Sequence, residues 1–380
     1  MLNILLVLYH DFSSNSAVHV HHFSNNLINL GLDCVVAVPW NKNTVPALVN
    51  PLYKVTEFKE VHNLKQFFSN KKEPDIVHIW TPREIVRTYW DRLKKLYKFK
   101  LVIHLEDNEE HLVEKFLQKP FKTLLTEKDV SVPENLSHPI RYREFLANAD
   151  GVTVIIDKLN QFVPSQIPTL ILWPGVDTEH FFPRKHDPTL AASLGIPLNT
   201  VVICYTGNVH AANSHEVRSV YLAVAMMNRE GQPARLIRTG RDFYEFLDSD
   251  DRWARRYSIE VGYVNRVQLP DILALANVLV QPGRADNFNN YRFPSKLPEF
   301  LAMGKPVVLP KANIGHLMKH GQDALVFPVV DALHIVDSVK LISQEQDLSN
   351  RLSHGAVNFA KTHLNWRRNS EALKSFYESL

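Results

Sequence analysis

The sequence predicts an α/β protein of two domains, each built on a parallel sheet with helices on both faces. Three observations lead to this prediction. The chain has 380 residues, 45% of them hydrophobic and 22% charged, and at roughly 150 residues per domain this length favours two globular domains. Short apolar runs alternate with amphipathic stretches, as expected for strands buried on both faces and the helices that cover them. The alternation stops at a proline-rich segment near residue 174 and then restarts.

Continuous apolar runs predict the strands of the first half. The first run is NILLVL at residues 3–8, and an amphipathic helix follows over residues 17–29, closed by Gly31. Later runs predict strands at residues 34–38, 75–80, 101–105, 151–156 and 170–173. We expect a first domain over residues 1–175, completed by the last helix of the chain at about residues 362–380.

The second half repeats the pattern after a hinge. Residues 174–188 carry three prolines and show no apolar period. Strands are then predicted at residues 201–205, 234–238, 258–261, 278–281 and 306–309, and the tail from residue 333 is helical. We expect a second domain over residues 176–361. Two such domains predict a ligand-binding cleft at the carboxyl ends of two sheets.

Composition excludes several other classes of protein. The formal net charge of +3 is too small to indicate nucleic-acid binding. The two cysteines, Cys34 and Cys204, are too few for a disulfide scaffold or a cysteine-based zinc site. No apolar run approaches the roughly 20 residues that cross a membrane. The first residues are typical of a buried strand rather than a signal peptide, so we expect a cytoplasmic protein.

Motif spacing argues against the common nucleotide, hydrolase and metal sites. None of the 13 glycines forms a G-x-G pair, and no G-x-S-x-G elbow occurs. His19, His21 and His22 form the cluster HVHH, but no nearby cysteine or HExxH motif completes a metal site. A solvated or cleft-lining helix start is the better interpretation of this cluster, and DSD at residues 248–250 is interpreted as a polar loop. We expect neither a metal nor a cofactor.

The segment from Arg292 to Phe327 is the most informative one. Ser295 is a suitable N-cap for a helix that runs to residue 303, and the free N–H groups of such a helix start suit a phosphate. Lys296 lies in the first turn, where a cation is unfavourable unless an anion is also bound. Glu299 lies one turn further on, nearly on the same face. An ordinary capped helix with surface charges explains this segment equally well.

In its order of motifs, nearly the whole chain resembles the retaining nucleotide-sugar glycosyltransferases of family 4, which have the GT-B fold. The segment 292–327 resembles their donor-site signature, and LILWPGVDTEHFFP at residues 170–183 resembles their connector between domains. Further segments are similar to their donor domain: VVICYTGN at 201–208, LIRTGRD at 236–242, the run 261–283, NIG at 313–315 and HGQDALVFP at 320–328. Trp366 opens a last helix of the kind that crosses back to the first domain.

The resemblance implies a donor site in the second domain. Glu299 matches the second glutamate of the paired-glutamate motif and is expected to bind the donor ribose, while Tyr291 stands in place of the first glutamate. Asn208 and Asn213 stand where the family has an arginine and a lysine that bind the diphosphate. Lys296 is therefore expected to supply the missing positive charge. The other residues expected to bind the donor are Gly207, Arg241, Arg292, Ser295, Leu297 and Val264, whose backbone is expected to read the base.

The resemblance also implies an acceptor site in the first domain. Ser14 and Asn15 stand in place of the glycine pair of the family, and His19 matches a family histidine. After the strand at 101–105, Glu106 or Asp107 takes the place of another histidine near the reacting sugar. Either carboxylate is expected to orient the sugar or the acceptor. A core-adjacent acidic loop is the alternative interpretation.

The implied reaction is transfer of a sugar from a nucleotide-diphosphate sugar, with UDP as the commoner nucleotide, to an acceptor hydroxyl with retention at the anomeric carbon. Lys296 stabilises the leaving diphosphate. The donor is a co-substrate, and the acceptor is a glycan, a lipid or a small molecule. Two alternatives remain open: a nucleotide-sugar 2-epimerase and a non-catalytic sugar-nucleotide-binding protein.

A basic segment raises the possibility of membrane contact. Residues 87–100 carry six basic residues, one acidic residue and four aromatic residues, a composition that favours contact with anionic lipid. An ordinary solvated helix is the alternative. Residues 112–139 interrupt the strand–helix alternation and are interpreted as an acceptor-specific insertion.

Overall fold

The computed structural model describes residues 1–47, 50–127 and 129–380. The chain forms two compact units, unit 1 with residues Met1–Pro174 and Trp366–Leu380 and unit 2 with residues Gly175–Asn365. The first boundary lies one residue before the expected one. The second lies at Trp366, because α11 (Gln346–His363) continues through the expected crossing point and belongs to unit 2.

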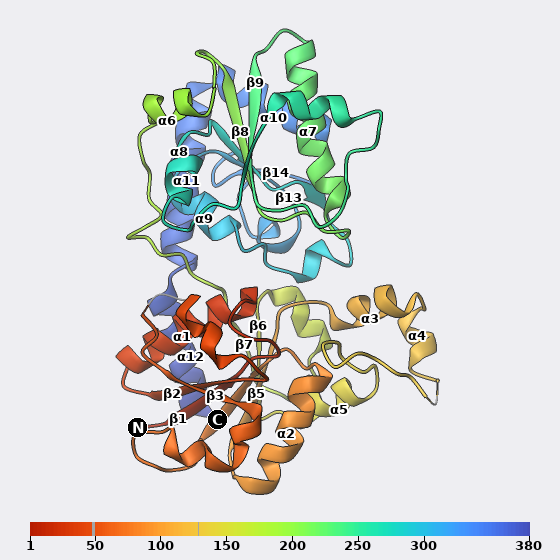
Figure 1. Ribbon diagram of the computed structural model, residues 1–380, viewed down its shortest axis with the longest axis vertical. Helices are drawn as coiled ribbons and strands as arrows, with labels where there is room; N and C mark the ends of the chain where they lie inside the picture. The colour runs from red at the N-terminus through yellow and green to blue at the C-terminus, as the bar shows by residue number, and fades with distance from the viewer. Residues whose placement is uncertain (48–49, 128) are drawn as a thin grey trace. The chain divides into compact units, whose positions relative to one another are not determined.

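Unit 1 is a parallel seven-stranded sheet with the order β3-β2-β1-β4-β5-β6-β7. Its strands are β1 (Asn3–Val7), β2 (Asp33–Val38), β3 (Lys54–Glu57), β4 (Ile76–Trp80), β5 (Lys100–Leu105), β6 (Gly151–Val154) and β7 (Thr169–Ile171). Its helices are α1 (Asn15–Asn29), α2 (Glu84–Leu96), α3 (Glu109–Leu117), α4 (Phe121–Leu124), α5 (Arg141–Ala147) and α12 (Trp366–Ser379), with short 3-10 helices at Lys42–Ala47, Phe58–Gln66 and Asp157–Phe162 (Figure 1).

The central strand explains why the apolar runs predicted unit 1 well. All five residues of β1 are buried, and Leu5 pairs with Val35 on one side and Val77 on the other. A strand buried on both faces needs apolar residues at every position. No apolar run marks β3, a four-residue edge strand with the sequence KVTE, and it was not predicted.

The last helix of the chain completes unit 1. Helix α12 packs against α1, and Lys374 donates a hydrogen bond of 2.9 Å to the carbonyl of Leu30 directly after α1. A Cβ atom at Gly151, the first residue of β6, would lie 2.8 Å from the Phe376 ring. A side chain here would therefore displace the Phe376 ring, and the absence of a Cβ at Gly151 lets α12 lie close to the sheet.

Unit 2 is a second parallel sheet, with the order β10-β9-β8-β11-β13-β14. Its strands are β8 (Val201–Thr206), β9 (Ala234–Thr239), β10 (Ser258–Gly262), β11 (Val278–Val280), β13 (Val307–Pro310) and β14 (Leu325–Phe327); β12 (Gly283–Arg284) and β15 (Val329–Val330) form a separate antiparallel pair. Its other helices are α6 (Pro188–Ser193), α7 (Ser214–Arg229), α8 (Leu269–Ala274), α9 (Leu297–Ala302) and α10 (Ala332–Gln344), with 3-10 helices at Arg252–Tyr257, Asn289–Tyr291 and Asn313–His316.

The helices of unit 2 lie on both sides of its sheet. Figure 1 shows α7 on one side of β8 and α8, α9 and α11 on the other. Helix α10 packs against α7, and α11 packs against α9. The predicted fold class, two parallel-sheet α/β domains, is confirmed. Parallel sheets of this kind place their loops and ligand sites at the carboxyl ends of the strands.

Candidate functional site

Two glycines bring the loops after β8 and β9 into close contact. Gly207 and Gly240 have φ angles of 120° and 102°, a region that side chains strongly disfavour. A Cβ atom at Gly240 would lie 2.4 Å from the Gly207 carbonyl oxygen. The amide of Val209 then donates to Arg241 at 2.9 Å. The result is a tight pair of loops at the carboxyl edge of the sheet.

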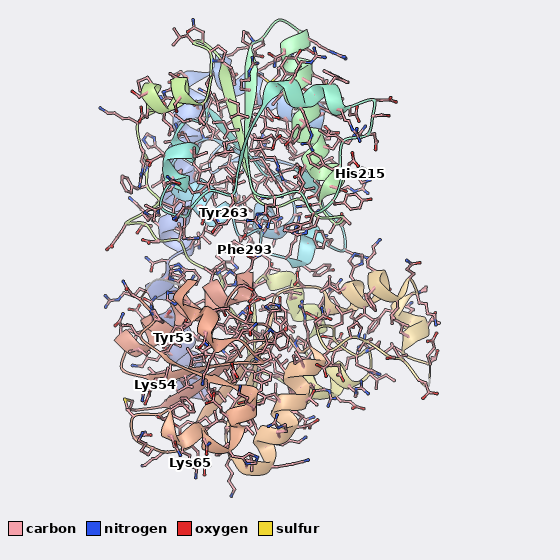
Figure 2. All side chains as sticks on the ribbon, viewed as in Figure 1. Tyr53, Lys54, Lys65, His215, Tyr263 and Phe293 are labelled. Carbon is pink, nitrogen blue, oxygen red and sulfur yellow. The ribbon has the colours of Figure 1, made fainter. Side chains whose placement is uncertain are left out.

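Asn208 helps to hold these two loops together. Its side-chain oxygen accepts a hydrogen bond of 2.8 Å from the backbone N–H of Arg241. The side-chain amide of Asn213 donates to the Asn208 carbonyl at 3.0 Å. These two residues, which stand where the resembled family has cations, thus stabilise the loop. The exposed Arg241 side chain lies 5.9 Å from the centre of the Tyr263 ring (Figure 2).

The Lys296 side chain is half-buried beside this loop, and its ammonium is desolvated. Its Nζ lies 3.7 Å from the centre of the Tyr205 ring and would lie 3.6 Å from a Cβ atom at Gly207. Among the described residues, no carboxylate lies within ion-pair distance of this ammonium. Burial lowers the pKa of Lys296 well below its usual range, and nearby Arg292 and Arg238 lower it further. An anion bound at this position would relieve an uncompensated charge.

Arg292 is differently placed, because it already has partners. It forms an ion pair of 3.3 Å with Glu216 and donates to the side-chain oxygen of Asn289 at 2.6 Å. Its guanidinium also lies 4.0 Å from the centre of the Phe288 ring. Burial raises the pKa of Glu216, and the charge of Arg292 opposes that rise. Arg292 therefore contributes to the local positive field while it holds the loop before α9.

The start of α9 differs from the sequence expectation. The helix spans only Leu297–Ala302, its N-cap residue is Lys296, and Ser295 is exposed and makes no capping hydrogen bond. Pro298 occupies the first turn, where a proline favours the helix start without needing an N–H partner. The expectation that Ser295 caps the helix is wrong. A six-residue helix offers little dipole, so Lys296 is the stronger feature for binding an anion. The Leu297 side chain is fully buried in the core, which leaves only its backbone for a ligand.

Glu299 is a buried carboxylate on α9. It is 8% exposed and forms an ion pair of 2.9 Å with Arg266. Burial raises the pKa of Glu299, and the charge and hydrogen bond of Arg266 oppose that rise. Val264 lies two residues before Arg266, in the loop between β10 and α8. The loop and the carboxylate are therefore joined through Arg266.

A second polar cluster lies in unit 1, around Glu106 directly after β5. Its Oε1 accepts hydrogen bonds from His19 Nδ1 at 3.0 Å and from Trp80 Nε1 at 2.9 Å, and its Oε2 accepts one from Ser16. Burial raises the pKa of Glu106, but its interactions with His19, His104 and Ser16 outweigh this and lower the pKa to about 2. Glu106 is thus a fixed, ionised carboxylate.

The other residues expected at the acceptor site lie either at the start of α1 or beside Arg83. Ser14 is the N-cap of α1 and accepts a hydrogen bond of 3.3 Å from Ala17, and Asn15, the first residue of the helix, is exposed. Asp107 lies 3.6 Å from the buried guanidinium of Arg83. The structure thus brings His19 and Glu106 together. Sequence reasoning missed Trp80 and Arg83, although both stand at the end of an apolar run, where parallel strands place functional side chains.

The HVHH cluster is not a solvated helix start. His21 is buried and lies 3.1 Å from the Tyr53 hydroxyl, and the His22 ring stacks on Trp366 with centres 4.5 Å apart. Over residues 1–47, 50–127 and 129–380, no group of three or more His, Cys, Asp or Glu side chains is arranged to hold a metal ion. These histidines therefore pack α1 against the strand β3 region and α12.

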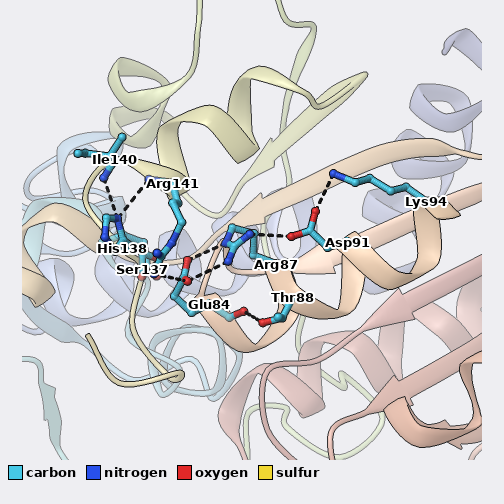
Figure 3. A network of polar contacts seen from close by, with 10 residues as sticks. Glu84, Arg87, Thr88, Asp91, Lys94, Ser137, His138, Ile140 and Arg141 are labelled. Atoms are coloured by element: carbon cyan, nitrogen blue, oxygen red, sulfur yellow. Dashed lines mark hydrogen bonds and ion pairs between the residues drawn. The ribbon is translucent and has the colours of Figure 1, made fainter. Parts of the chain in front are cut away.

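In the basic segment at residues 87–100, fewer basic and aromatic side chains are available for contact with lipid than expected. Arg87 pairs with Glu84 and Asp91, both at 2.8 Å (Figure 3). Tyr89 and Tyr97 are buried, so they cannot lie on a lipid surface. Figure 3 also shows Glu84 bound to Arg141, which ties α2 to the chain beyond the expected insertion at 112–139. Residue 128 of that insertion lies outside the described residues.

In the described parts of the chain, no helix combines the length and apolar character needed to span a bilayer. The two parallel sheets, each with a polar cluster at its carboxyl edge, define the fold class: it is that of the GT-B glycosyltransferases.

Comparisons with known proteins agree with this class. Residues 200–344 match the model of the family described as glycosyl transferases group 1. A curated relative, the D-inositol 3-phosphate glycosyltransferase of Saccharomonospora viridis, is 25% identical over 270 residues, which cover 64% of this chain and 59% of the relative. The matched region thus spans less than two thirds of that relative's length.

Solved structures match the whole chain at low sequence identity. The Anabaena protein HepE in complex with UDP and glucose has a TM-score of 0.74 at 13% identity, with 100% of both chains covered. The sucrose-phosphate synthase of Thermosynechococcus elongatus has a TM-score of 0.69 at 16% identity and covers 100% of this chain and 99% of its own. These two likenesses establish the fold.

Proposed function

We propose that the protein is a glycosyltransferase that moves a sugar from a nucleotide-diphosphate sugar, with UDP as the nucleotide, to an acceptor hydroxyl with retention at the anomeric carbon. The match of residues 200–344 to glycosyl transferases group 1 and the GT-B fold support this proposal. The relatives give no support to the alternatives of a 2-epimerase or a non-catalytic binding protein.

The observation that carries the proposal is the unpaired ammonium of Lys296 beside the Gly207 loop. A diphosphate here would meet a desolvated cation, where electrostatic attraction is much stronger than in water. Two further cations, Arg292 and Arg238, act on the same position. The side chains of unit 2 thus supply positive charge for a leaving diphosphate without requiring a metal ion.

The rest of the nucleoside would lie along the neighbouring loops. We assign the ribose hydroxyls to Glu299, the buried carboxylate on α9. The base is assigned to the backbone around Val264. Asn208 and Arg241 shape the loop against which the diphosphate binds, and the exposed Ser295 lies next to Lys296.

In the proposed reaction, the bond between the anomeric carbon and the diphosphate oxygen breaks while a bond to the acceptor oxygen forms on the same face. The acceptor proton passes to an oxygen of the leaving diphosphate. Lys296 stabilises the negative charge that grows on that group. In unit 1, His19 and Asp107 are proposed to orient the acceptor, and Glu106 acts through His19 because its oxygens already accept three hydrogen bonds.

Calorimetry with UDP, followed by an assay of transfer from a panel of nucleotide sugars, tests the proposal. We expect Lys296→Met and Glu299→Gln each to weaken UDP binding by about 10-fold or more, equivalent to about 1.4 kcal/mol. Lys340→Met, which changes an exposed lysine paired with Glu230 in the same unit, should leave the affinity unchanged. Unchanged UDP affinity in both site variants would contradict the donor site, and NMR of the product's anomeric proton would test retention.

A further inference from the structure

We infer that Arg266 is a positioning residue for nucleotide binding: it holds the Glu299 carboxylate in the orientation that accepts a ribose hydroxyl. This inference rests on the proposed function, because it deepens the role assigned to Glu299. It gives a role to Arg266, which lies in the run 261–283 but was not among the residues expected to bind the donor.

The geometry of the pair is asymmetric. Glu299 is buried on α9, whereas the Arg266 side chain is 50% exposed, on the loop between β10 and α8. Nη1 of Arg266 lies 2.9 Å from Oε1 of Glu299. The pair thus holds the carboxylate from the side of this loop. A carboxylate oriented by a charge-assisted contact keeps further lone pairs that can accept a hydrogen bond from a hydroxyl.

Arg266 is itself held in place from two directions. The Nε2–H of His180 donates a hydrogen bond of 2.8 Å to the Arg266 carbonyl. The guanidinium lies 5.1 Å from the centre of the Phe181 ring. Arg184 in turn donates to the His180 carbonyl at 2.8 Å. The connector before α6 therefore fixes the backbone and the guanidinium of this loop residue.

Burial alone would favour the neutral form of Glu299. It raises the pKa of the carboxyl, and Arg266, the larger of the two opposing charges, together with His180, lowers it. These two residues are the charged or titratable groups that act on Glu299 among the described residues. Neither α8 nor α11, which packs against α9, places a charge that acts on it. Removing Arg266 would therefore leave a carboxyl that binds a proton more readily and loses its orientation.

The test compares UDP affinity at two pH values. Arg266→Gln should weaken UDP binding relative to the unmodified protein by about 10-fold at pH 6.5 and by less at pH 8.5, because loss of the arginine raises the pKa of Glu299 further and the lower pH favours its neutral form. At each pH, the dissociation constant of the variant is divided by that of the unmodified protein. This ratio removes effects shared by both proteins, such as titration of UDP and of Lys296. Arg252→Gln, which changes an exposed arginine paired with Glu245 in the same unit, should leave the ratio at one.

Two results would overturn the inference. One is an equal loss at both pH values, which indicates a merely structural loop contact. The other is tighter UDP binding by Arg266→Gln, which indicates that the arginine blocks the site. In the Glu299→Gln background, Arg266→Gln should have no further effect. If Glu299→Gln alone does not change UDP affinity, the proposed ribose site is wrong. If Glu299→Gln weakens UDP binding but Arg266→Gln weakens it equally at both pH values, only the role of Arg266 is wrong.

A measurement without ligand keeps the inference testable if UDP does not bind. The urea-unfolding midpoints of the single and double variants form a double-mutant cycle for Arg266 and Glu299. We expect a coupling that is larger at pH 8.5 than at pH 6.5 in the ligand-free protein. Absence of any coupling at either pH would contradict the inference independently of the nucleotide.

Discussion

Nδ1 of His19 lies 3.0 Å from Oε1 of Glu106 in the interior of unit 1. The two residues come from α1 and from the end of β5, next to β4, whose last residue, Trp80, donates to the same oxygen. In the tautomer that donates Nδ1–H to this carboxylate, the other ring nitrogen is left as a hydrogen-bond acceptor. Glu106 thus sets the tautomer of a histidine that we place on the acceptor side.

Glu106→Gln should destabilise unit 1 by about 3 kcal/mol at pH 7, because the amide cannot accept all three hydrogen bonds. The folded-state pKa of about 2 lies below the usual value of 4.5. The stabilising contribution of Glu106 is therefore present above pH 4.5 and is lost as the pH falls towards 2. Urea unfolding should show that the difference in free energy of unfolding between the variant and the unmodified protein is smaller at pH 3 than at pH 7.

Glu371→Gln is the matched control for that measurement, because Glu371 forms an exposed pair with Arg367 on α12 in the same unit. It should change the unfolding midpoint very little. If the difference in free energy of unfolding between Glu106→Gln and the unmodified protein stays constant from pH 7 to pH 3, Glu106 is not the ionised, enclosed carboxylate described here.

His104 predicts a second pH dependence in unit 1. It is buried between β4 and β6, with Nδ1 2.7 Å from the Thr153 hydroxyl, and burial lowers its pKa to about 3. An unfolded histidine gains its proton near pH 6.5. Stability should therefore fall as the pH drops from 6.5 towards 3. In His104→Phe this fall should be shallower by up to about 1.4 kcal/mol per pH unit, whereas exposed His186→Gln should follow the unmodified protein.

Lys296→Met should stabilise the ligand-free protein while it weakens UDP binding. A buried ammonium without an acidic partner costs free energy, and methionine fills a similar volume without that cost. We expect the unfolding midpoint to rise by an amount equivalent to about 1 kcal/mol or more, as is common when a charged functional residue is removed. A midpoint that falls in Lys296→Met would show that the ammonium stabilises the fold.

UDP binding should also take up protons at Lys296. Its pKa is lowered in the free protein, and a bound diphosphate would raise it. Calorimetry at pH 8.5 in two buffers of different ionisation enthalpy should therefore show proton uptake. Lys296→Arg, which stays charged at every accessible pH, should abolish it. Equal uptake in both proteins would assign the proton to another group.

We expect contact with anionic membranes to depend on the exposed end of α2. Co-sedimentation with phosphatidylserine vesicles should fall when Arg92, Lys94 and Lys95 are replaced together by glutamine, and added salt should weaken it. Lys94 packs over the Trp90 ring at 3.7 Å, so these residues form the remaining basic and aromatic surface. Absence of sedimentation at both low and high salt would reject this contact.

Sequence reasoning worked best where one physical requirement fixed every position. The apolar run at residues 3–8 predicted β1 to within one residue at its end, because burial on both faces leaves no polar position. The three-residue edge strand β14 was missed, although β11, of the same length but buried at every position, was predicted. The start of α9 was misplaced because Ser295 is a good capping residue in general, while the chain here begins the helix after Lys296.

The partners within the sites were harder to predict than the elements. Trp80 and Glu106 are 26 residues apart in sequence and meet only because β4 and β5 are neighbours in the sheet. Arg266 reaches Glu299 from a loop that has no regular pattern. Side-chain pairs of this kind depend on loop geometry, which local spacing does not encode.

A structure of the protein in complex with UDP is the decisive test of the donor site. We expect a diphosphate oxygen within hydrogen-bond distance of Lys296 Nζ, beside Gly207. A diphosphate bound elsewhere, with Lys296 still over Tyr205 and no phosphate near it, would show that Lys296 does not bind the donor.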